Sequence, residues 1–194
     1  MTKPTIIAFT GIKGSGKNTA AEALLEVFGQ NTKDGLAVEF AFADSLKNII
    51  HETFDIDNFQ ADEIKRLNIK PFNGLTLREV YQRLAEAIKS RFGQNTWVDF
   101  AIKRMQEFVD SINPDIIICT DLRYTNEEAH LRKFAEDNGY DLYIIKMLNT
   151  NLVENDDHIS ETQIKDISED FLIKASDPDE IKLQIGEIYN AISE

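Results

Sequence analysis

Residues 11–17 match the spacing G-x-x-x-x-G-K, which is typical of a loop that binds phosphate. Glycines in such a loop allow backbone N–H groups to turn inward around an anion, and the N-terminus of a following helix adds partial positive charge. Lys17 would reach the β- and γ-phosphates of a nucleotide. The residues predicted to bind the phosphates of ATP are Gly11, Lys13, Gly14, Ser15, Gly16, Lys17, Asn18 and Thr19.

Oxygen ligands near this loop predict a site for Mg²⁺. The residue after the loop lysine is usually Ser or Thr, but here it is Asn18, followed by Thr19. Asn18 could act through its carbonyl or a water, or Thr19 could replace it. Asp121 follows the apolar run 116–120, and a carboxylate at the end of a buried strand can orient Mg²⁺ and its waters. Because parallel strands end at one edge of a sheet, we expect Asp121 near the loop.

Arginine is concentrated in the middle of the chain, between positions 66 and 132. Arg123 lies two residues after Asp121 and could clamp a phosphate with two hydrogen bonds. A cation there opposes the dipole of the next helix, which favours an anionic ligand. Arg78 and Gln82 share a stripe of a predicted helix and could hold a phosphate and read a base, although a solvated polar flank explains them equally well. Asp44 could cap a helix or bind a substrate hydroxyl.

Alternating strands and helices must position these residues. Apolar runs predict strands at 5–9, 36–41, 115–120, 141–147 and 170–173, with helical patterns between them. Gly29 is expected to end the first helix, and Asp44 to cap the second. Capping boxes are predicted at Thr76 with Glu79 and at Thr125 with Glu128. Strands separated by helices predict a parallel α/β sheet.

Composition excludes several classes of partner. The chain has 194 residues, no linker-like stretch and a net charge of −13, so we expect one domain that binds neither nucleic acid nor an anionic membrane. No apolar run approaches the roughly 18 residues of a membrane span. The single cysteine, Cys119, lies in an apolar run and is expected to be a small buried side chain in a reducing compartment. These features predict a cytoplasmic protein.

These motifs together resemble the deoxynucleoside monophosphate kinases of tailed bacteriophages, over nearly the whole chain. Residues 11–19 are similar to that family's G-x-x-x-S-G-K-D-T, with Asn18 in place of Asp. Residues 121–127 are similar to its D-x-R-x-x-N-E motif. Further similar segments are 42–47 (F-A-D-x-L-K), 77–82 (R-x-x-L-Q), 92–98 and 158–161 (H-x-S-E).

The resemblance implies a P-loop kinase fold over 1–194: a three-layer α/β/α domain with a central parallel five-stranded sheet. Residues about 45–112 would form a helical insertion that binds the nucleoside monophosphate. The implied reaction transfers the γ-phosphoryl group of ATP to a deoxynucleoside monophosphate, with Mg²⁺ as cofactor. Lys17, Asp121 and Arg123 would form the catalytic set. The implied substrate-binding residues are Asp44, Lys47, Phe72, Arg78, Gln82 and Arg123.

Two other functions stay open at this stage. The chain could be another small-molecule P-loop kinase, such as a dephospho-coenzyme A or phosphomevalonate kinase. It could also be a non-catalytic module that binds ATP, although a second phosphate clamp argues against this. The sequence leaves the bases accepted and the oligomeric state open, a homodimer included. A phage-encoded protein would act in the host cytoplasm.

Overall fold

The computed structural model describes residues 3–67, 70, 72–151 and 163–193, which form two compact units. The sheet unit comprises Met1–Ala41 and Arg104–Glu194, and the helical unit comprises Phe42–Lys103. The helical segment predicted at about 45–112 therefore covers most of the helical unit and runs on into the sheet unit. Helix α5, Thr96–Ile112, is the element that crosses this boundary.

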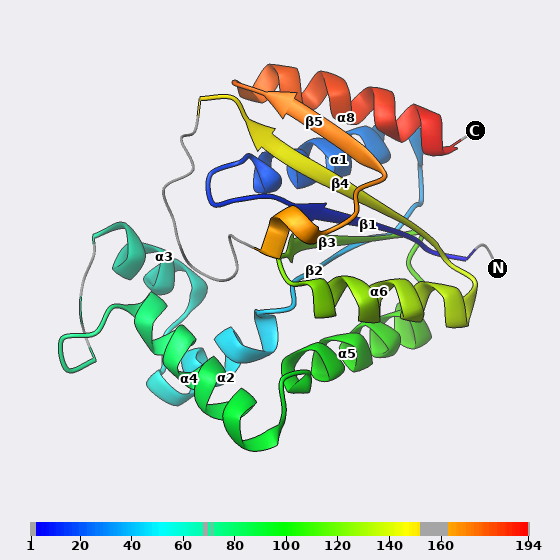
Figure 1. Cartoon of the computed structure of the whole chain (residues 1–194). Helices are drawn as coiled ribbons and strands as arrows, with labels where there is room; N and C mark the ends of the chain where they lie inside the picture. The colour runs from blue at the N-terminus through cyan, green and yellow to red at the C-terminus, as the bar shows by residue number, and fades with distance from the viewer. Residues whose placement is uncertain (1–2, 68–69, 71, 152–162, 194) are drawn as a thin grey trace. The chain divides into compact units, whose positions relative to one another are not determined.

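The sheet unit is built on five parallel strands, as the sequence predicts, and their order in the sheet is β2-β3-β1-β4-β5. Helices α1 and α8 lie on one face of the sheet and α6 lies on the other (Figure 1). This arrangement places β1 in the centre, between β3 and β4. The bounds of these elements are β1 Thr5–Thr10, α1 Lys17–Asn31, β2 Ala37–Phe40, β3 Ile116–Leu122, α6 Thr125–Asn138, β4 Asp141–Asn149, β5 Phe171–Ala175 and α8 Pro178–Ser193, with a 3₁₀ turn at Ile164–Asp166.

Burial on both faces explains the unbroken apolar runs of the central strands. Ile6, Ile7 and Phe9 of β1 are fully buried, which is expected for a strand covered on both sides. Cys119 of β3 is also fully buried, as the sequence predicts. The face under α1 and α8 forms one apolar cluster, which includes Ile7, Phe9, Leu24, Phe28, Ile118, Met147, Ile181 and Tyr189.

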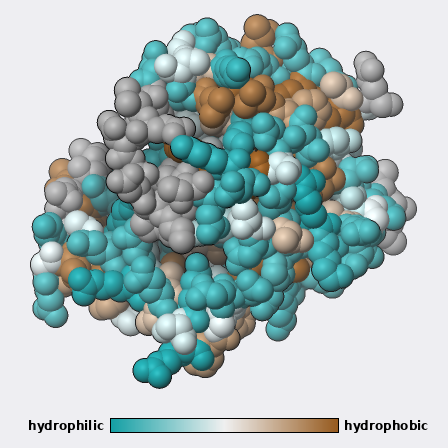
Figure 2. All heavy atoms as spheres, viewed as in Figure 1, coloured by the Kyte–Doolittle hydropathy of each residue, from teal (hydrophilic) through white to brown (hydrophobic). Residues whose placement is uncertain are grey.

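Strand β5 forms one of the two edges of the sheet. Leu172 of β5 and Leu148 of β4 are exposed, and Figure 2 shows apolar residues gathered over this part of the surface. The side-chain amide of Gln184 donates to the carbonyl of Lys174 at 3.0 Å, so one backbone group of this edge is satisfied within the chain. Among the described residues, no helix is long and apolar enough to cross a membrane.

The helical unit has its own small core. Helices α2 (Asp44–Phe54), α3 (Asn58–Arg66) and α4 (Leu77–Phe92) pack with the first turns of α5 around buried apolar side chains. The predicted capping box at Thr76 and Glu79 is confirmed at the start of α4. The buried side chains of this core are Leu46, Ile50, Ala61, Leu77 and Trp97.

The first helix extends further than the sequence indicates. Gly29 lies inside α1, which continues to Asn31. Two side chains stabilise the last turn of this helix. Asn31 Nδ2 donates to the backbone carbonyl of Val27 at 2.8 Å, and the Thr32 hydroxyl donates to the backbone carbonyl of Phe28 at 2.7 Å. The prediction that Gly29 ends the helix is therefore wrong, because its backbone has no positive φ that would stop the helix.

Two predicted helix starts also differ from the structure. Asp44 is the first residue of α2 rather than its cap, because the N-cap position is taken by Ala43. The capping box predicted from Thr125 and Glu128 is wrong by one residue, since Tyr124 is the N-cap of α6 and Glu127 reaches back to it. Both errors have the same cause. Moving the start of a helix by one residue leaves its apolar pattern unchanged but gives the N-cap position to a different residue.

Candidate phosphate-binding site

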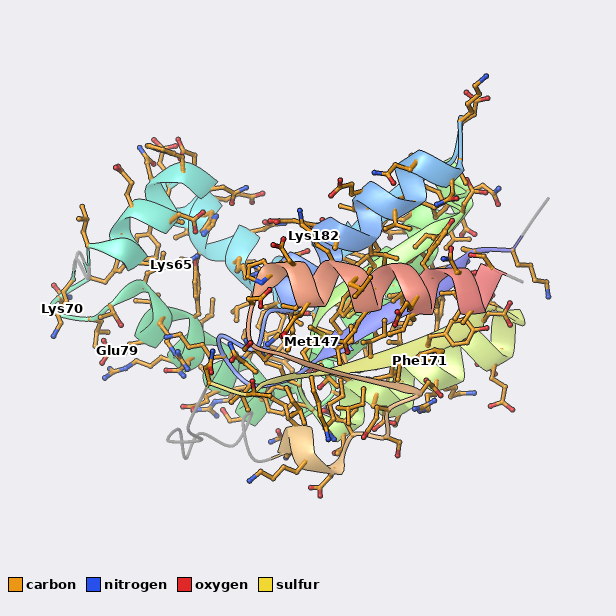
Figure 3. The ribbon with its side chains drawn as sticks, turned by 90° about the horizontal axis from the view of Figure 1, so that it is seen from above. Lys65, Lys70, Glu79, Met147, Phe171 and Lys182 are labelled. Atoms are coloured by element: carbon orange, nitrogen blue, oxygen red, sulfur yellow. The ribbon has the colours of Figure 1, made fainter. Side chains whose placement is uncertain are left out.

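The loop between β1 and α1 requires its glycines. Gly11, Gly14 and Gly16 have φ values of 148°, 80° and 94°, which side chains rarely adopt. A Cβ on Gly11 would lie 2.6 Å from the backbone oxygen of Met147, in the neighbouring strand β4, where Figure 3 labels Met147. The same atom would lie 2.6 Å from Ser15 Oγ. A side chain at position 11 would therefore collide with the sheet and with the loop itself, so the close approach of the loop to the sheet requires glycine there.

Lys17 is folded over this loop. It is the first residue of α1 and only 7% exposed, and its Nζ donates to the carbonyls of Gly11 at 2.6 Å and Ile12 at 2.9 Å. Gly16 supplies no side-chain cap to α1, and the first turn contains no acidic residue. The partial positive charge of the helix N-terminus and the ammonium group thus act on the same loop, which suits it to an anion.

A β-bulge lies beside the loop, on the neighbouring strand β3. Ala8 pairs with Cys119 and Thr10 pairs with Leu122, so Thr120 and Asp121 together stand opposite a single residue of β1. Asp121 is half-buried and lies within β3 rather than after it, because the strand continues to Leu122. Arg123 follows directly and is also half-buried. The structure thus brings Asp121 and Arg123 to the strand end next to the one that carries the loop.

The structure adds contacts that the sequence did not reveal. Asn149, the last residue of β4, donates from Nδ2 to the carbonyl of Gly14 at 3.3 Å, so both neighbours of β1 supply a polar side chain at this edge. The hydroxyls of Thr10 and Ser15 are buried without a hydrogen-bond partner in the described part of the chain. The position of Asn149 at the end of a strand could have marked it as a candidate site residue. Only the strand order, however, shows that this strand lies next to β1.

The remaining predicted residues belong to the helical unit. Asp44 and Lys47 of α2 form an ion pair at 3.6 Å. Arg78 is exposed and Gln82 is half-buried, one turn apart on α4. Phe72 packs edge-on against Phe54, with a centroid distance of 4.6 Å, so its ring contributes to the packing of this unit. The H-x-S-E segment at 158–161 lies outside the described residues.

A polar contact ties α2 to α4 within the helical unit. His51 Nε2 and the Tyr81 hydroxyl form a 2.6 Å hydrogen bond. Burial, and secondarily the negative charge of Asp62, raises the pKa of Tyr81 from 10.0 to about 12. The contact links the helix that carries Asp44 and Lys47 to the helix that carries Gln82.

This pKa shift predicts a loss of stability at alkaline pH. Folding favours the neutral phenol, so the contribution of Tyr81 is complete below pH 10 and is lost as the pH rises towards 12. Trp97 is the single tryptophan and is buried in the same core, so its emission during urea unfolding measures the effect. We expect Tyr81→Phe to be less stable by about 1 kcal/mol at pH 7. The free energy of unfolding of this variant should also fall less steeply between pH 10 and 12 than that of the wild type. An equal fall in both proteins would contradict the raised pKa of Tyr81.

The comparisons with known proteins identify the fold. No family model and no curated protein matches the chain. Among solved structures, the APS kinase CysC of Mycobacterium tuberculosis, in complex with AMPPNP and APS, is 14% identical, with 100% of both chains covered and a TM-score of 0.50. The tunicamycin resistance protein of Deinococcus radiodurans is 11% identical, with 97% of this chain and 96% of that chain covered and a TM-score of 0.50.

A proposed kinase from Chloroflexus aurantiacus is similar over the same length. It is 11% identical, covers 100% of this chain and 98% of its own, and has a TM-score of 0.52. These identities are too low to carry an activity from one protein to another, but the shared architecture extends over the whole chain. With a central sheet of five parallel strands and helices on both of its faces, the chain has the P-loop kinase fold.

Proposed function

We propose that this chain is an ATP-dependent kinase that phosphorylates a deoxynucleoside 5′-monophosphate. The observation that carries the proposal is the loop that holds Lys17, with Asp121 and Arg123 on the adjacent strand end. One phosphate site alone would suit any nucleotide-binding protein, whereas a guanidinium beside it suits a second phosphate. The choice of a deoxynucleoside monophosphate rests on the sequence motifs that resemble the phage kinases.

The reaction makes few demands on proton transfer. An oxygen of the acceptor phosphate attacks the γ-phosphorus of ATP, a new P–O bond forms, and the bond to the oxygen that leaves with ADP breaks. The attacking oxygen is already anionic near neutral pH, so no side chain has to act as a general base. The protein must hold two polyanions in line and neutralise their charge, which are the main contributions to phosphoryl transfer.

Each half of the reaction has its own set of side chains. Lys17 would exchange the carbonyls of Gly11 and Ile12 for the β- and γ-phosphate oxygens, which are stronger acceptors because they are charged. Arg123 would hold the acceptor phosphate, together with Arg78. The sugar and base would be bound by the other predicted residues of the helical unit, Asp44, Lys47, Phe72 and Gln82.

The residues near the loop fit a magnesium ion. Mg²⁺ prefers oxygen ligands and is usually held by one or two protein groups together with phosphate and water. Thr19 is half-buried and Asn18 is exposed in the first turn of α1, and Asp121 is a half-buried carboxylate on the adjacent strand. Asp121 and either Thr19 or Asn18 would hold the ion. When bound, Mg²⁺ would neutralise charge on the β- and γ-phosphates.

The proposal predicts release of ADP that depends on a deoxynucleoside monophosphate. We would measure it in a coupled assay with Mg·ATP and a panel of all common deoxy- and ribonucleoside monophosphates, dephospho-coenzyme A, phosphomevalonate and a blank without acceptor. We expect turnover with one or more deoxynucleoside monophosphates only. Turnover with another acceptor would keep the kinase and overturn its substrate. ATP binding without turnover above the blank would leave only a nucleotide-binding module.

A further inference from the structure

The N-termini of α4 and α6 are each closed by a glutamate, but the two glutamates differ in burial and reach. On α4, exposed Glu79 accepts from the backbone N–H and hydroxyl of Thr76 at 2.7 and 2.8 Å (Figure 3). On α6, Glu127 is only 8% exposed, and its Oε2 accepts from the N–H groups of Tyr124 at 3.1 Å and Arg123 at 2.9 Å. The bond to Arg123 extends one residue beyond the N-cap, which a capping box does not require.

This additional bond fixes the backbone from which the Arg123 side chain projects. The N–H groups of Arg123 and Tyr124 belong to the peptide planes on either side of the Arg123 Cα. One buried carboxylate oxygen therefore restrains both planes. Hydrogen bonds to a charged acceptor are stronger than those to a neutral one, so these two bonds favour one backbone conformation over its alternatives.

Charge supports the same arrangement. Arg123 places a cation just before the N-terminus of α6, where the helix dipole disfavours it, and the Glu127 carboxylate in the first turn offsets this repulsion. An ordinary cap would need neither the burial of Glu127 nor its contact with the Arg123 N–H. Both features suit an arginine that has to be in place before its ligand arrives.

We infer that Glu127 is a positioning residue, which preorganises Arg123 for the acceptor phosphate without touching it. The inference rests on the proposed function, because the anion held by Arg123 is taken to be that phosphate. Glu127 would act on the acceptor half of the reaction alone, and the loop that holds ATP would keep its geometry. Its effect should therefore appear in acceptor kinetics and depend on the presence of Arg123.

The neighbouring residue provides a matched control. Glu128 lies on the same helix and is 9% exposed, but its Oε1 accepts from Arg132 Nε at 2.8 Å and from the Ser168 N–H at 3.3 Å. We expect Glu127→Ala to lower kcat/KM for the acceptor by about 10–100-fold, with KM for ATP unchanged. Glu128→Ala should affect thermal stability similarly and acceptor kinetics by less than about threefold. Glu127→Gln keeps an acceptor oxygen but loses the negative charge, so it should recover part of the loss.

Two further measurements separate this inference from its premise. In the Arg123→Ala background, Glu127→Ala should cost less than about threefold more, because the two residues act as a unit. Amide hydrogen exchange of Arg123 and Tyr124 should quicken by about tenfold or more in Glu127→Ala but not in Glu128→Ala. A wild-type chain inactive with every acceptor would overturn the proposed function. Three results would each overturn the role of Glu127. The first is amide exchange of Arg123 and Tyr124 that Glu127→Ala leaves unchanged, and the second is an equal fall in acceptor kcat/KM in Glu127→Ala and Glu128→Ala. The third is additive falls in kcat/KM when Glu127→Ala is combined with Arg123→Ala.

Discussion

Lys17→Met will abolish phosphoryl transfer almost completely, with a fall in kcat/KM of about 10³-fold or more. Lys17 donates from Nζ to the carbonyls of Gly11 and Ile12, and it is only 7% exposed. In the proposed reaction, a cation held at that position would act where negative charge develops between the β- and γ-phosphates. Methionine has a similar length and is apolar, so it fills the space but supplies no charge.

The fold should survive this substitution. The two hydrogen bonds that Lys17 makes to the loop are exchanged for apolar packing, so we expect thermal unfolding to shift by only a few degrees. Lys182→Met is the matched control, because Lys182 of α8 forms an exposed 3.7 Å ion pair with Glu26 of α1, a type of contact worth little. We expect it to leave the rate unchanged. A Lys17→Met enzyme within tenfold of the wild type would exclude the proposed phosphate site.

Much of the sheet unit could be predicted from the sequence, because local patterns determine it. The apolar run that contains Ile117 and Ile118 has no polar alternation, which indicates a strand covered on both faces, and both residues are fully or almost fully buried. The loop could be recognised because its function needs glycines at particular places, and Gly11 and Gly16 have the positive φ values that such a loop requires.

Features that depend on strand register or on single caps could not be predicted. The bulge at Asp121 exists only relative to the pairing of β1 with β3, and the contact of Asn149 with Gly14 needs the position of β4 beside β1. Whether Glu127 or Glu128 closes α6 depends on a displacement of one residue, which the helical pattern tolerates. Such choices are made by tertiary contacts, and a local pattern carries no information about them.

Gly11→Ala is expected to destroy the loop, since neither its backbone nor its neighbour can adjust. Its φ of 148° disfavours any side chain, and the new Cβ would lie 2.6 Å from the backbone oxygen of Met147. Met147 is paired with Ile173 inside the sheet, so that oxygen cannot move away cheaply. We expect a loss of about 3 kcal/mol or more in the free energy of unfolding, and no measurable binding of ATP.

Alanine substitutions at two other glycines serve as comparisons for Gly11→Ala. A Cβ on Gly16 would lie 2.6 Å from Ile181 Cδ1, the flexible end of a side chain, so Gly16→Ala should suffer mainly from its φ of 94° and lose about 1–2 kcal/mol. Gly29 lies in α1 with no atom within 4 Å of a new Cβ, so Gly29→Ala should gain up to about 1 kcal/mol. Urea unfolding and ATP titration of the three variants test this order. A Gly11→Ala protein that binds ATP as well as Gly29→Ala would show that the loop does not need the backbone conformation described.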